Sequence, residues 1–363
     1  MPQLASSAQF RHALYYSAGS NDLPRQVVTA DLRNIGILDL VIADYLSNRV
    51  SVLLGNGDGT FQKPLRFPVS SPIGIATGDM NGDGKPDLVI IESGGTGKSL
   101  LAVFLGNGDG TFRQAGTGLL GIYSANVALA DFNSDGHLDV AVANRGFDRP
   151  GSVMVFLGDG KGNVKDRITY KVAGGPWGIA AGDLNRDGHP DLAAALDLAG
   201  SVAVLINDGT GHFLKPVTYS AGGGEVVDVK IADLRHDGRN DLVIANLSAG
   251  MVVLLNKGDG TFGKPAIYRP CAGQCSAGPE ACTVADLNLD GKLDVACSAS
   301  IDDSYFFYGK GDGTFGTAIA IADTIKNQGG YSIASGDFNH DGAPDLAIPI
   351  EYDGKVAILL NTQ

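Results

Sequence analysis

The chain has 363 residues, of which 44% are hydrophobic and 52 are glycine, and its formal net charge is −13. This acidic balance argues against a nucleic-acid partner, and no apolar run approaches the roughly 18 residues of a membrane span, so we expect no membrane insertion. Only four of the 40 acidic residues are glutamate. The excess of aspartate indicates short carboxylates held in turns, where they cap backbone groups or bind hard cations.

A nine-residue phrase recurs along the whole chain. Five intact copies are DMNGDGKPD from Asp79, DFNSDGHLD from Asp131, DLNRDGHPD from Asp183, DLNLDGKLD from Asp286 and DFNHDGAPD from Asp337. Two altered copies are DLRNIGILD from Asp31 and DLRHDGRND from Asp233. The regular spacing, about 50 residues, is typical of a repeat architecture and divides the chain into seven units.

Each unit reads as four short strands. An apolar stretch precedes the phrase, as in IGIAAG before Asp183, and alternating apolar runs follow it, as in DLVII from Asp87 and LLAVFLGN from Leu100. A glycine-rich turn then precedes a last segment that often ends in tyrosine, as at Tyr219. That turn is written GDGTF at Gly57, Gly108, Gly258 and Gly311. Strands divided by such turns pair antiparallel, and we predict an all-β fold, a seven-bladed β-propeller forming one domain over residues 1–363.

The two ends of the chain predict that the ring closes. The seventh unit stops at Asn361, before its glycine-rich turn and fourth strand. Phe10 and Tyr16 have the same spacing as Phe213 and Tyr219, which occupy a turn and a fourth strand. Residues near 9–18 should therefore supply the outer strand of the last blade and cover two strand edges at once.

The phrases DxNxDGxxD and GNGDGTF resemble the FG-GAP and VCBS-type repeats of bacterial secreted proteins. They are also similar to the calcium-bearing blades of integrin α-chain propellers and of fungal propeller lectins. The resemblance covers nearly the whole chain. It implies a propeller fold and bound metal, and it leaves function open among adhesion, sugar binding and accessory roles.

The intact phrases carry oxygen ligands in a pattern that suits calcium. Side chains at positions 1, 3 and 5 point to one centre, glycine at position 6 permits the turn, the carbonyl of position 7 faces inward and aspartate at position 9 closes the site. Magnesium prefers a tighter octahedron and keeps its waters. We expect about five Ca²⁺ per chain, with these ligands: Asp79, Asn81, Asp83, Lys85, Asp87; Asp131, Asn133, Asp135, His137, Asp139; Asp183, Asn185, Asp187, His189, Asp191; Asp286, Asn288, Asp290, Lys292, Asp294; Asp337, Asn339, Asp341, Ala343, Asp345.

The altered phrases predict loops without calcium. Arg33 and Ile35 replace ligands in the first. In the fifth, Arg235 replaces asparagine and either swings inward as a built-in cation or outward to leave a weak site. The glycine-rich turns also place Asn56 near Asp58, and a two-residue hairpin turn that needs positive φ is favoured there over a second metal site.

A different set of residues gathers on the face opposite the metal loops. That face collects the loops between second and third strands and the connections between blades, where variable binding residues usually lie. All four glutamates map there, together with the candidate ligand-binding residues Trp177, Tyr45, Tyr331, Tyr352 and Arg145. Trp177 either stacks on a sugar ring or packs into the rim.

The cysteines favour an oxidising compartment, since no paired CxxC spacing is present. Cys282 and Cys297 fall on neighbouring strands, where they pair or remain buried thiols. Cys271 and Cys275 lie in an enlarged connection and could close a small loop. We predict two disulfides and a secreted protein. The segment MPQLASSAQF lacks a basic region followed by an apolar stretch, so we expect the signal peptide to be absent from this sequence.

The sequence indicates a binding module and no catalytic residues. Four of the six histidines fall inside the phrases, and no Ser/His/Asp arrangement is evident. We expect a monomer that binds a carbohydrate or an extracellular protein. The alternatives are a lyase-like enzyme acting on polysaccharides and a structural spacer in a secreted assembly.

Overall fold

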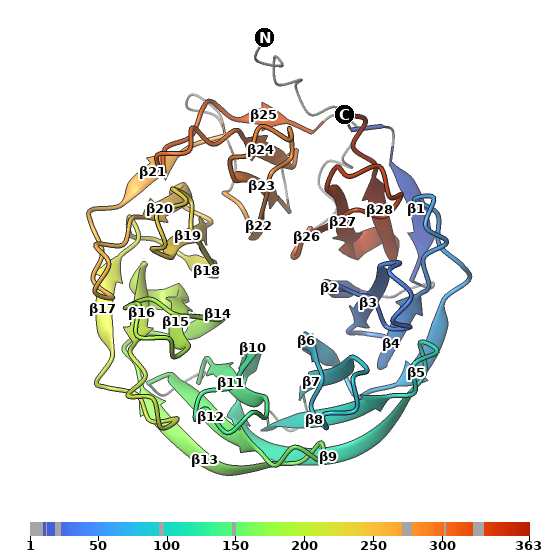
Figure 1. The fold of residues 1–363 in the computed structure, drawn as a ribbon, viewed down its shortest axis with the longest axis horizontal. Coiled ribbons are helices and arrows are strands. Elements are labelled where there is room, and N and C mark those ends of the chain that lie inside the picture. Colours follow the sequence, from blue (N-terminus) through green and yellow to red (C-terminus); the bar gives the residue numbers. More distant parts are fainter. Residues whose placement is uncertain are drawn as a thin grey trace.

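The computed structural model describes residues 10–11, 13–18, 23–93, 98–146, 150–270, 278–300, 303–321 and 330–363. Its strands form seven sheets of four antiparallel strands each, arranged as blades around a central axis (Figure 1). The predicted seven-bladed propeller is therefore confirmed. Among the described residues, no helix is long and apolar enough to cross a membrane.

The strands take equivalent places from blade to blade. The innermost are β2 (Pro24–Ala30), β6 (Pro72–Gly78), β10 (Ser124–Ala130), β14 (Pro176–Gly182), β18 (Val226–Ala232), β22 (Ala281–Ala285) and β26 (Ala334–Gly336). The second are β3 (Asp39–Asp44), β7 (Asp87–Ser93), β11 (Asp139–Asn144), β15 (Asp191–Leu196), β19 (Asp241–Asn246), β23 (Asp294–Ser298) and β27 (Asp345–Ile350).

The third strands are β4 (Arg49–Leu53), β8 (Lys98–Gly106), β12 (Ser152–Gly158), β16 (Ser201–Leu205), β20 (Gly250–Leu254), β24 (Tyr305–Phe307) and β28 (Lys355–Leu359). The outermost are β5 (Leu65–Pro68), β9 (Phe112–Ile122), β13 (Val164–Lys171), β17 (Val217–Ser220), β21 (Ala266–Tyr268), β25 (Ile319–Ala320) and β1 (Leu14–Ser17). Two 3-10 turns, η1 (Asp197–Ala199) and η2 (Glu351–Asp353), follow β15 and β27.

The ring closes through the N-terminal strand, as the sequence predicts. β1 pairs antiparallel with β28 in the register Leu14↔Ile358 to Ser17↔Lys355, so the last blade has the order β1-β28-β27-β26. Phe10 extends this pairing through a bridge to Asn361. β1 and the C-terminal end of the chain lie beside this blade in Figure 1.

Aromatic side chains join neighbouring blades near the glycine-rich turns. Phe61 packs edge-on against Tyr16 of the closing strand and against Phe338, with ring centroids 5.5 and 5.6 Å apart. The Tyr16 hydroxyl also accepts the backbone N–H of Phe61 at 3.1 Å. Tyr170 repeats this arrangement on Phe213, which explains why phenylalanine and tyrosine recur at these places in the repeat.

A disulfide joins Cys282 on β22 to Cys297 on β23, as predicted, with the two Cα atoms 4.1 Å apart. The residues are directly opposite each other in the antiparallel register, and both are buried. The second predicted bridge, between Cys271 and Cys275, lies outside the described residues.

Candidate functional site

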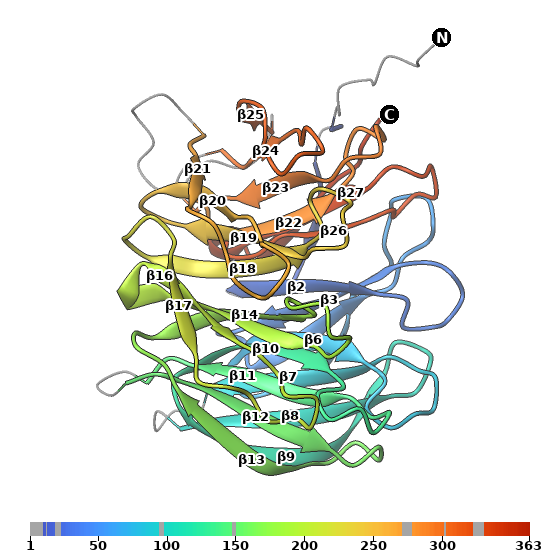
Figure 2. The same cartoon turned by 60° about the vertical axis from the view of Figure 1, so that its left-hand side comes forward.

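The phrases form loops that join the first and second strands of each blade. In Figure 2 the loop between β2 and β3 projects from the right-hand side of the ring. In the loop from Asp79, its carboxylate accepts the N–H of Gly84 at 2.7 Å. Asn81 accepts from Asp83, and Asp83 accepts from Lys85, both at 3.0 Å. The side chains that predict calcium therefore organise the turn through backbone amides.

The ninth residue of each intact phrase is a fully buried aspartate. Asp87 accepts the N–H groups of Met80 and Gly106, both at 2.8 Å, and the other intact loops repeat these contacts. Burial raises the pKa of Asp345 to about 7, and the charges of Asp341 and Asp337 push it in the same direction. The same causes raise the pKa to about 6 at Asp139, Asp191 and Asp294.

The donor chemistry of these loops fits calcium. Each intact loop offers three carboxylates, an amide oxygen and a backbone carbonyl, which are hard oxygen ligands, and a cation would relieve the repulsion that raises the pKa of the ninth aspartate. As the side chains stand, the described residues contain no group of three or more acidic, histidine or cysteine side chains that could hold an ion. A carboxylate that accepts a backbone N–H keeps further lone pairs, so the hydrogen bonds of these loops do not prevent the same side chains from binding an ion.

The two altered loops contain an arginine at position 3 of the phrase, in place of the asparagine ligand, and it points inward. Arg235 donates to both carboxylate oxygens of Asp241, at 3.1 and 2.8 Å, and to the carbonyl of Asn256 at 2.8 Å. Arg33 makes the equivalent contacts to Asp39 and the carbonyl of Gly55. Of the two orientations that the sequence leaves open for Arg235, the structure has the inward one, a cation built into the loop.

The glycine-rich turns are hairpin turns. Asp58 accepts from the backbone N–H and the hydroxyl of Thr60 at 2.9 and 2.5 Å, and Gly57 and Gly59 both have φ of +81°. The predicted hairpin turn with positive φ is present, but three residues, 57–59, lie between Asn56 and Thr60, whose backbones pair at 2.9 Å, where the sequence predicts two.

An axial pocket opens on the opposite face, where the innermost strands begin. It has a volume of about 1090 Å³, part of it open to solvent. Every blade contributes the residue six places before the first aspartate of its phrase. In blade order these seven residues are Arg25, Ile73, Ala125, Trp177, Val227, Glu280 and Tyr331. We call this place in the repeat the pocket position.

A bulge aims the pocket position toward the axis in five blades. The ladder between β2 and β3 passes from Pro24↔Asp44 to Gln26↔Ala43, so Arg25 is left without a partner strand residue. The first strands of the next four blades are interrupted at the same place. Bulges commonly re-aim a side chain beside a functional site, and here they turn one residue per blade into the pocket lining.

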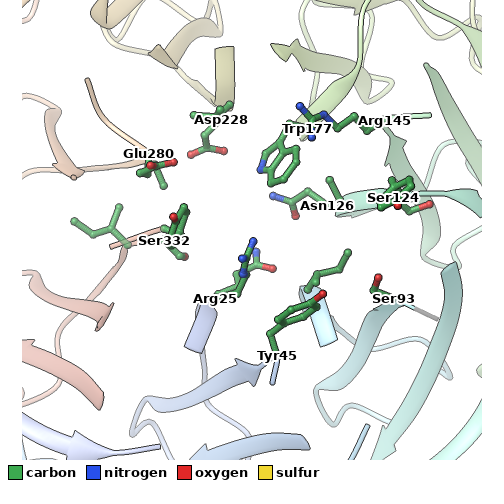
Figure 3. Close-up of a pocket in the computed structure, with 18 of the residues that line it drawn as sticks. Arg25, Tyr45, Ser93, Ser124, Asn126, Arg145, Trp177, Asp228, Glu280 and Ser332 are labelled. Atoms are coloured by element: carbon green, nitrogen blue, oxygen red, sulfur yellow. The ribbon is translucent and has the colours of Figure 1, made fainter. Parts of the chain in front are cut away.

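Arg25 lies near Tyr45 at the pocket (Figure 3) and also contacts the ring of Tyr331. Its guanidinium lies 5.0 Å from the ring centroid of Tyr45 and 5.2 Å from that of Tyr331, and its Nε lies 3.3 Å from the buried Glu351 carboxylate. Glu351 also accepts a hydrogen bond from Tyr331. Burial and the neighbouring carboxylates of Glu351 and Glu280 raise the pKa of Tyr331 to about 12, so this ring is a neutral hydrogen-bonding surface.

Trp177 and Arg145 form another part of the wall. The guanidinium of Arg145 lies 4.9 Å from the Trp177 ring centroid and pairs with Asp197 on η1. The indole also packs against the hydrophobic cluster that includes Val227. Trp177 is therefore partly buried and held in place, while it still lines the pocket.

Carboxylates lie across the pocket from Arg145, as Figure 3 shows. Asp228 pairs with Lys230 at 2.8 Å and accepts the N–H of Cys282 at 3.2 Å. Glu280 begins the neighbouring blade, and burial raises the pKa of its carboxyl, with further upward contributions from Glu351 and Glu225.

Four of the five candidate ligand residues therefore meet in one pocket, namely Trp177, Tyr45, Tyr331 and Arg145. Tyr352 lies on η2 outside the lining, with 67% of its surface exposed. Arg25, Asp228 and Lys230 were not predicted from the sequence, and Glu280 had no assigned role. Arg25 and Glu280 carry a signal, the pocket position, whose residue type differs in every blade while the position two places later stays apolar.

A family model for the FG-GAP-like repeat matches residues 31–90, 79–142, 131–194, 187–244, 233–297 and 286–348. The chain belongs to the FG-GAP-like repeat family. No curated protein was found with a similar sequence.

Solved structures share the fold of this FG-GAP-like repeat protein. An Agrocybe aegerita lectin, solved for its specific recognition of non-reducing terminal N-acetylglucosamine, has a TM-score of 0.60 and 21% identity, over 93% of this chain and 85% of the lectin. BBS1N in complex with ARL6DN gives TM-scores of 0.64 and 0.65 in two structures, with 14% and 15% identity, over 99% and 98% of this chain and 98% and 97% of BBS1N. At these identities the likeness shows the fold alone.

Proposed function

We propose that the protein is a secreted, monomeric, calcium-stabilised binding module that recognises a carbohydrate through the axial pocket and leaves it chemically unchanged. The observation that supports this is the convergence of Trp177, Tyr45 and Tyr331 with fixed polar groups around one hollow. Aromatic faces stack on the apolar faces of sugars, while placed donors and acceptors orient the hydroxyls. The Agrocybe aegerita lectin, which has the same fold, recognises a sugar.

The groups around the pocket favour binding over turnover. None of the described lining residues is a histidine, and Tyr331, with its pKa near 12, is a poor base at neutral pH. Arg25 and Arg145 are held by ring contacts and by Glu351 and Asp197. A rigid lining of this kind lowers the entropic cost of binding.

Calcium in the five intact loops would rigidify the opposite face without touching the ligand. When bound, the ion supplies positive charge beside the ninth aspartate of each loop. Asp79, Asn81, Asp83 and Asp87, with the carbonyl of Lys85, would hold it in the second blade, and the equivalent residues would do so in the others. In the first and fifth blades, the inward arginine supplies this positive charge beside the ninth aspartate.

A glycan-array screen of the calcium-replete protein, followed by the variant Trp177→Ala, tests this proposal. We expect the wild type to bind one class of glycan and to release no products from it. Trp177→Ala should weaken binding by about tenfold, since an aromatic contact contributes on the order of 0.5–1.5 kcal/mol beyond the area it buries and about 1.4 kcal/mol corresponds to tenfold. Its calcium content should match that of the wild type.

Tyr352→Ala is the matched control, because this tyrosine is exposed on the same face but lies outside the pocket lining. It should reduce binding less than Trp177→Ala does. Degradation of a polysaccharide by the wild type would refute the binding assignment, as would normal glycan binding by Trp177→Ala.

A further inference from the structure

The charges around the axial pocket do not balance. Each cation of the lining has a carboxylate within ion-pair distance: Arg25 has Glu351, Arg145 has Asp197 and Lys230 has Asp228. Glu280 lines the same pocket and forms no ion pair with any of the described residues, although Ser300 donates a hydrogen bond to it. Once these pairs are set aside, the pocket retains a negative charge at Glu280.

Glu280 belongs to a local cluster that is itself negative. The charges of Glu351 and Glu225 raise the pKa of Glu280. Arg25 is the one cation among the charges that act on it, and it lowers this pKa. Glu280 is therefore close enough to two other glutamates and to one arginine to interact with them. A carboxylate partly removed from water in such a place is costly unless a positive group joins it.

The rest of the lining gives a ligand its orientation. Ile73, Ala125, Trp177 and Val227 supply the pocket position in four consecutive blades, and Glu280, Tyr331 and Arg25 supply it in the other three. At the pocket position one arc is therefore apolar and aromatic and the other is polar, while Arg145, Asp228 and Lys230 add charged groups beside the apolar arc. A ligand that fits presents an apolar face to the first arc and a positive group to Glu280.

We infer that the axial pocket selects glycans that carry a free, protonated amino group, with the ammonium seated on the Glu280 carboxylate and the sugar face against the arc around Trp177. This inference rests on the proposed function. It excludes uronate-bearing or sulfated glycans as preferred ligands, because their anionic groups would meet Glu280 and the carboxylates behind each cation. A charge-assisted hydrogen bond supplies the discrimination between an amine and its uncharged acetamide.

Calorimetric titration at neutral pH with glucosamine trimer and N-acetylglucosamine trimer tests the inference. The wild type should bind the free-amine trimer about tenfold more tightly or better, the difference that one charge-assisted contact provides. Glu280→Gln should lose this preference and bind the two trimers about equally. Glu225→Gln removes the same charge from the same cluster but not from the lining, and it should keep most of the preference.

The outcomes separate the inference from the proposed function. Equal binding of the two trimers by the wild type, or a preference that survives in Glu280→Gln, would overturn the choice of an amine while leaving glycan binding intact. If neither trimer nor any glycan on the array bound to calcium-replete protein, the proposed function itself would fail. A lysine-containing peptide that bound more tightly than every oligosaccharide would overturn the glycan part of the inference.

Discussion

Replacing Arg235 with asparagine should convert the fifth blade into a sixth calcium loop. The change turns DLRHDGRND into DLNHDGRND and restores the asparagine ligand at position 3 of the phrase. Arg235 now holds the fully buried Asp241 through two hydrogen bonds, pairs with Asp237 at 3.3 Å and donates to the Asn256 carbonyl. Removing the guanidinium leaves the Asp241 and Asp237 carboxylates without a positive partner. It also vacates the position in the loop where Ca²⁺ would bind.

The size of the effect follows from these contacts. Breaking a buried ion pair by removing one partner costs about 3–5 kcal/mol, which corresponds to a melting temperature lower by on the order of 5 °C for a chain of this length. That loss should appear in chelator. Calcium at about 100 times its Kd returns about 2.7 kcal/mol to the folded state, so most of the loss should disappear in excess calcium.

The assay combines elemental analysis with thermal unfolding in chelator and in calcium. Arg235→Asn should contain one calcium more than the wild type and depend more strongly on calcium for its stability. Arg239→Asn is the control, because Arg239 belongs to the same loop and reaches Asp237 at 3.7 Å without contacting Asp241. If Arg235→Asn showed the wild-type calcium content and the wild-type melting temperature in chelator, the role of the arginine as a built-in cation would be refuted.

Four further predictions concern the ring, the metal, the disulfide and the pocket. Deleting residues 1–19 should lower the melting temperature because it uncovers the edge of β28, and an unchanged melting temperature would count against closure of the ring by β1. Elemental analysis after calcium-replete purification should find about five ions per chain, and two or fewer would contradict the loop assignment. Thiol titration of the unfolded, unreduced protein should find Cys282 and Cys297 unreactive, and four free thiols would contradict the bridge. Because burial raises the pKa of Glu280 above its ordinary 4.5, its ionised form opposes folding above that pH. Glu280→Gln should therefore raise the melting temperature at neutral pH but not in acid below pH 4.5, and a gain independent of pH would contradict this.

The fold could be predicted because the same pattern of strands and turns recurs seven times in the sequence. The closing strand could be predicted because Phe10 and Tyr16 keep the spacing of a turn and an outer strand, and the structure gives the physical reason. Tyr16 accepts the N–H of Phe61 in the first blade, just as Tyr170 accepts that of Phe213. The spacing between the phenylalanine and the tyrosine maintains these contacts between neighbouring blades. It is therefore kept in the last blade as well, although that blade is built from both N-terminal and C-terminal strands.

The pocket could be predicted only in part, because its charged residues have partners far along the chain. Trp177 stands out in the sequence as the sole tryptophan, whereas Arg25 looks like an ordinary surface residue. Its place between Tyr45 and Tyr331 and its contact with Glu351 depend on the ring closing. The inward turn of Arg235 was likewise one of two open alternatives until the position of Asp241 was known.

The bulge at the pocket position explains why one place in the repeat can vary so freely. Arg25 has no partner in the ladder, while Val27, two residues later, is buried in the core between blades. A change at Arg25 therefore alters neither strand pairing nor the packing of Val27, whereas Trp177 and Val227 line the pocket and also pack into a core cluster. Because seven such positions meet at the axis, substitutions there change the chemistry of a single pocket, while the ninth aspartates on the other face maintain the frame. Binding specificity and stability are in this way assigned to opposite faces of the same seven blades: to the start of the first strands on one face and to the start of the second strands on the other.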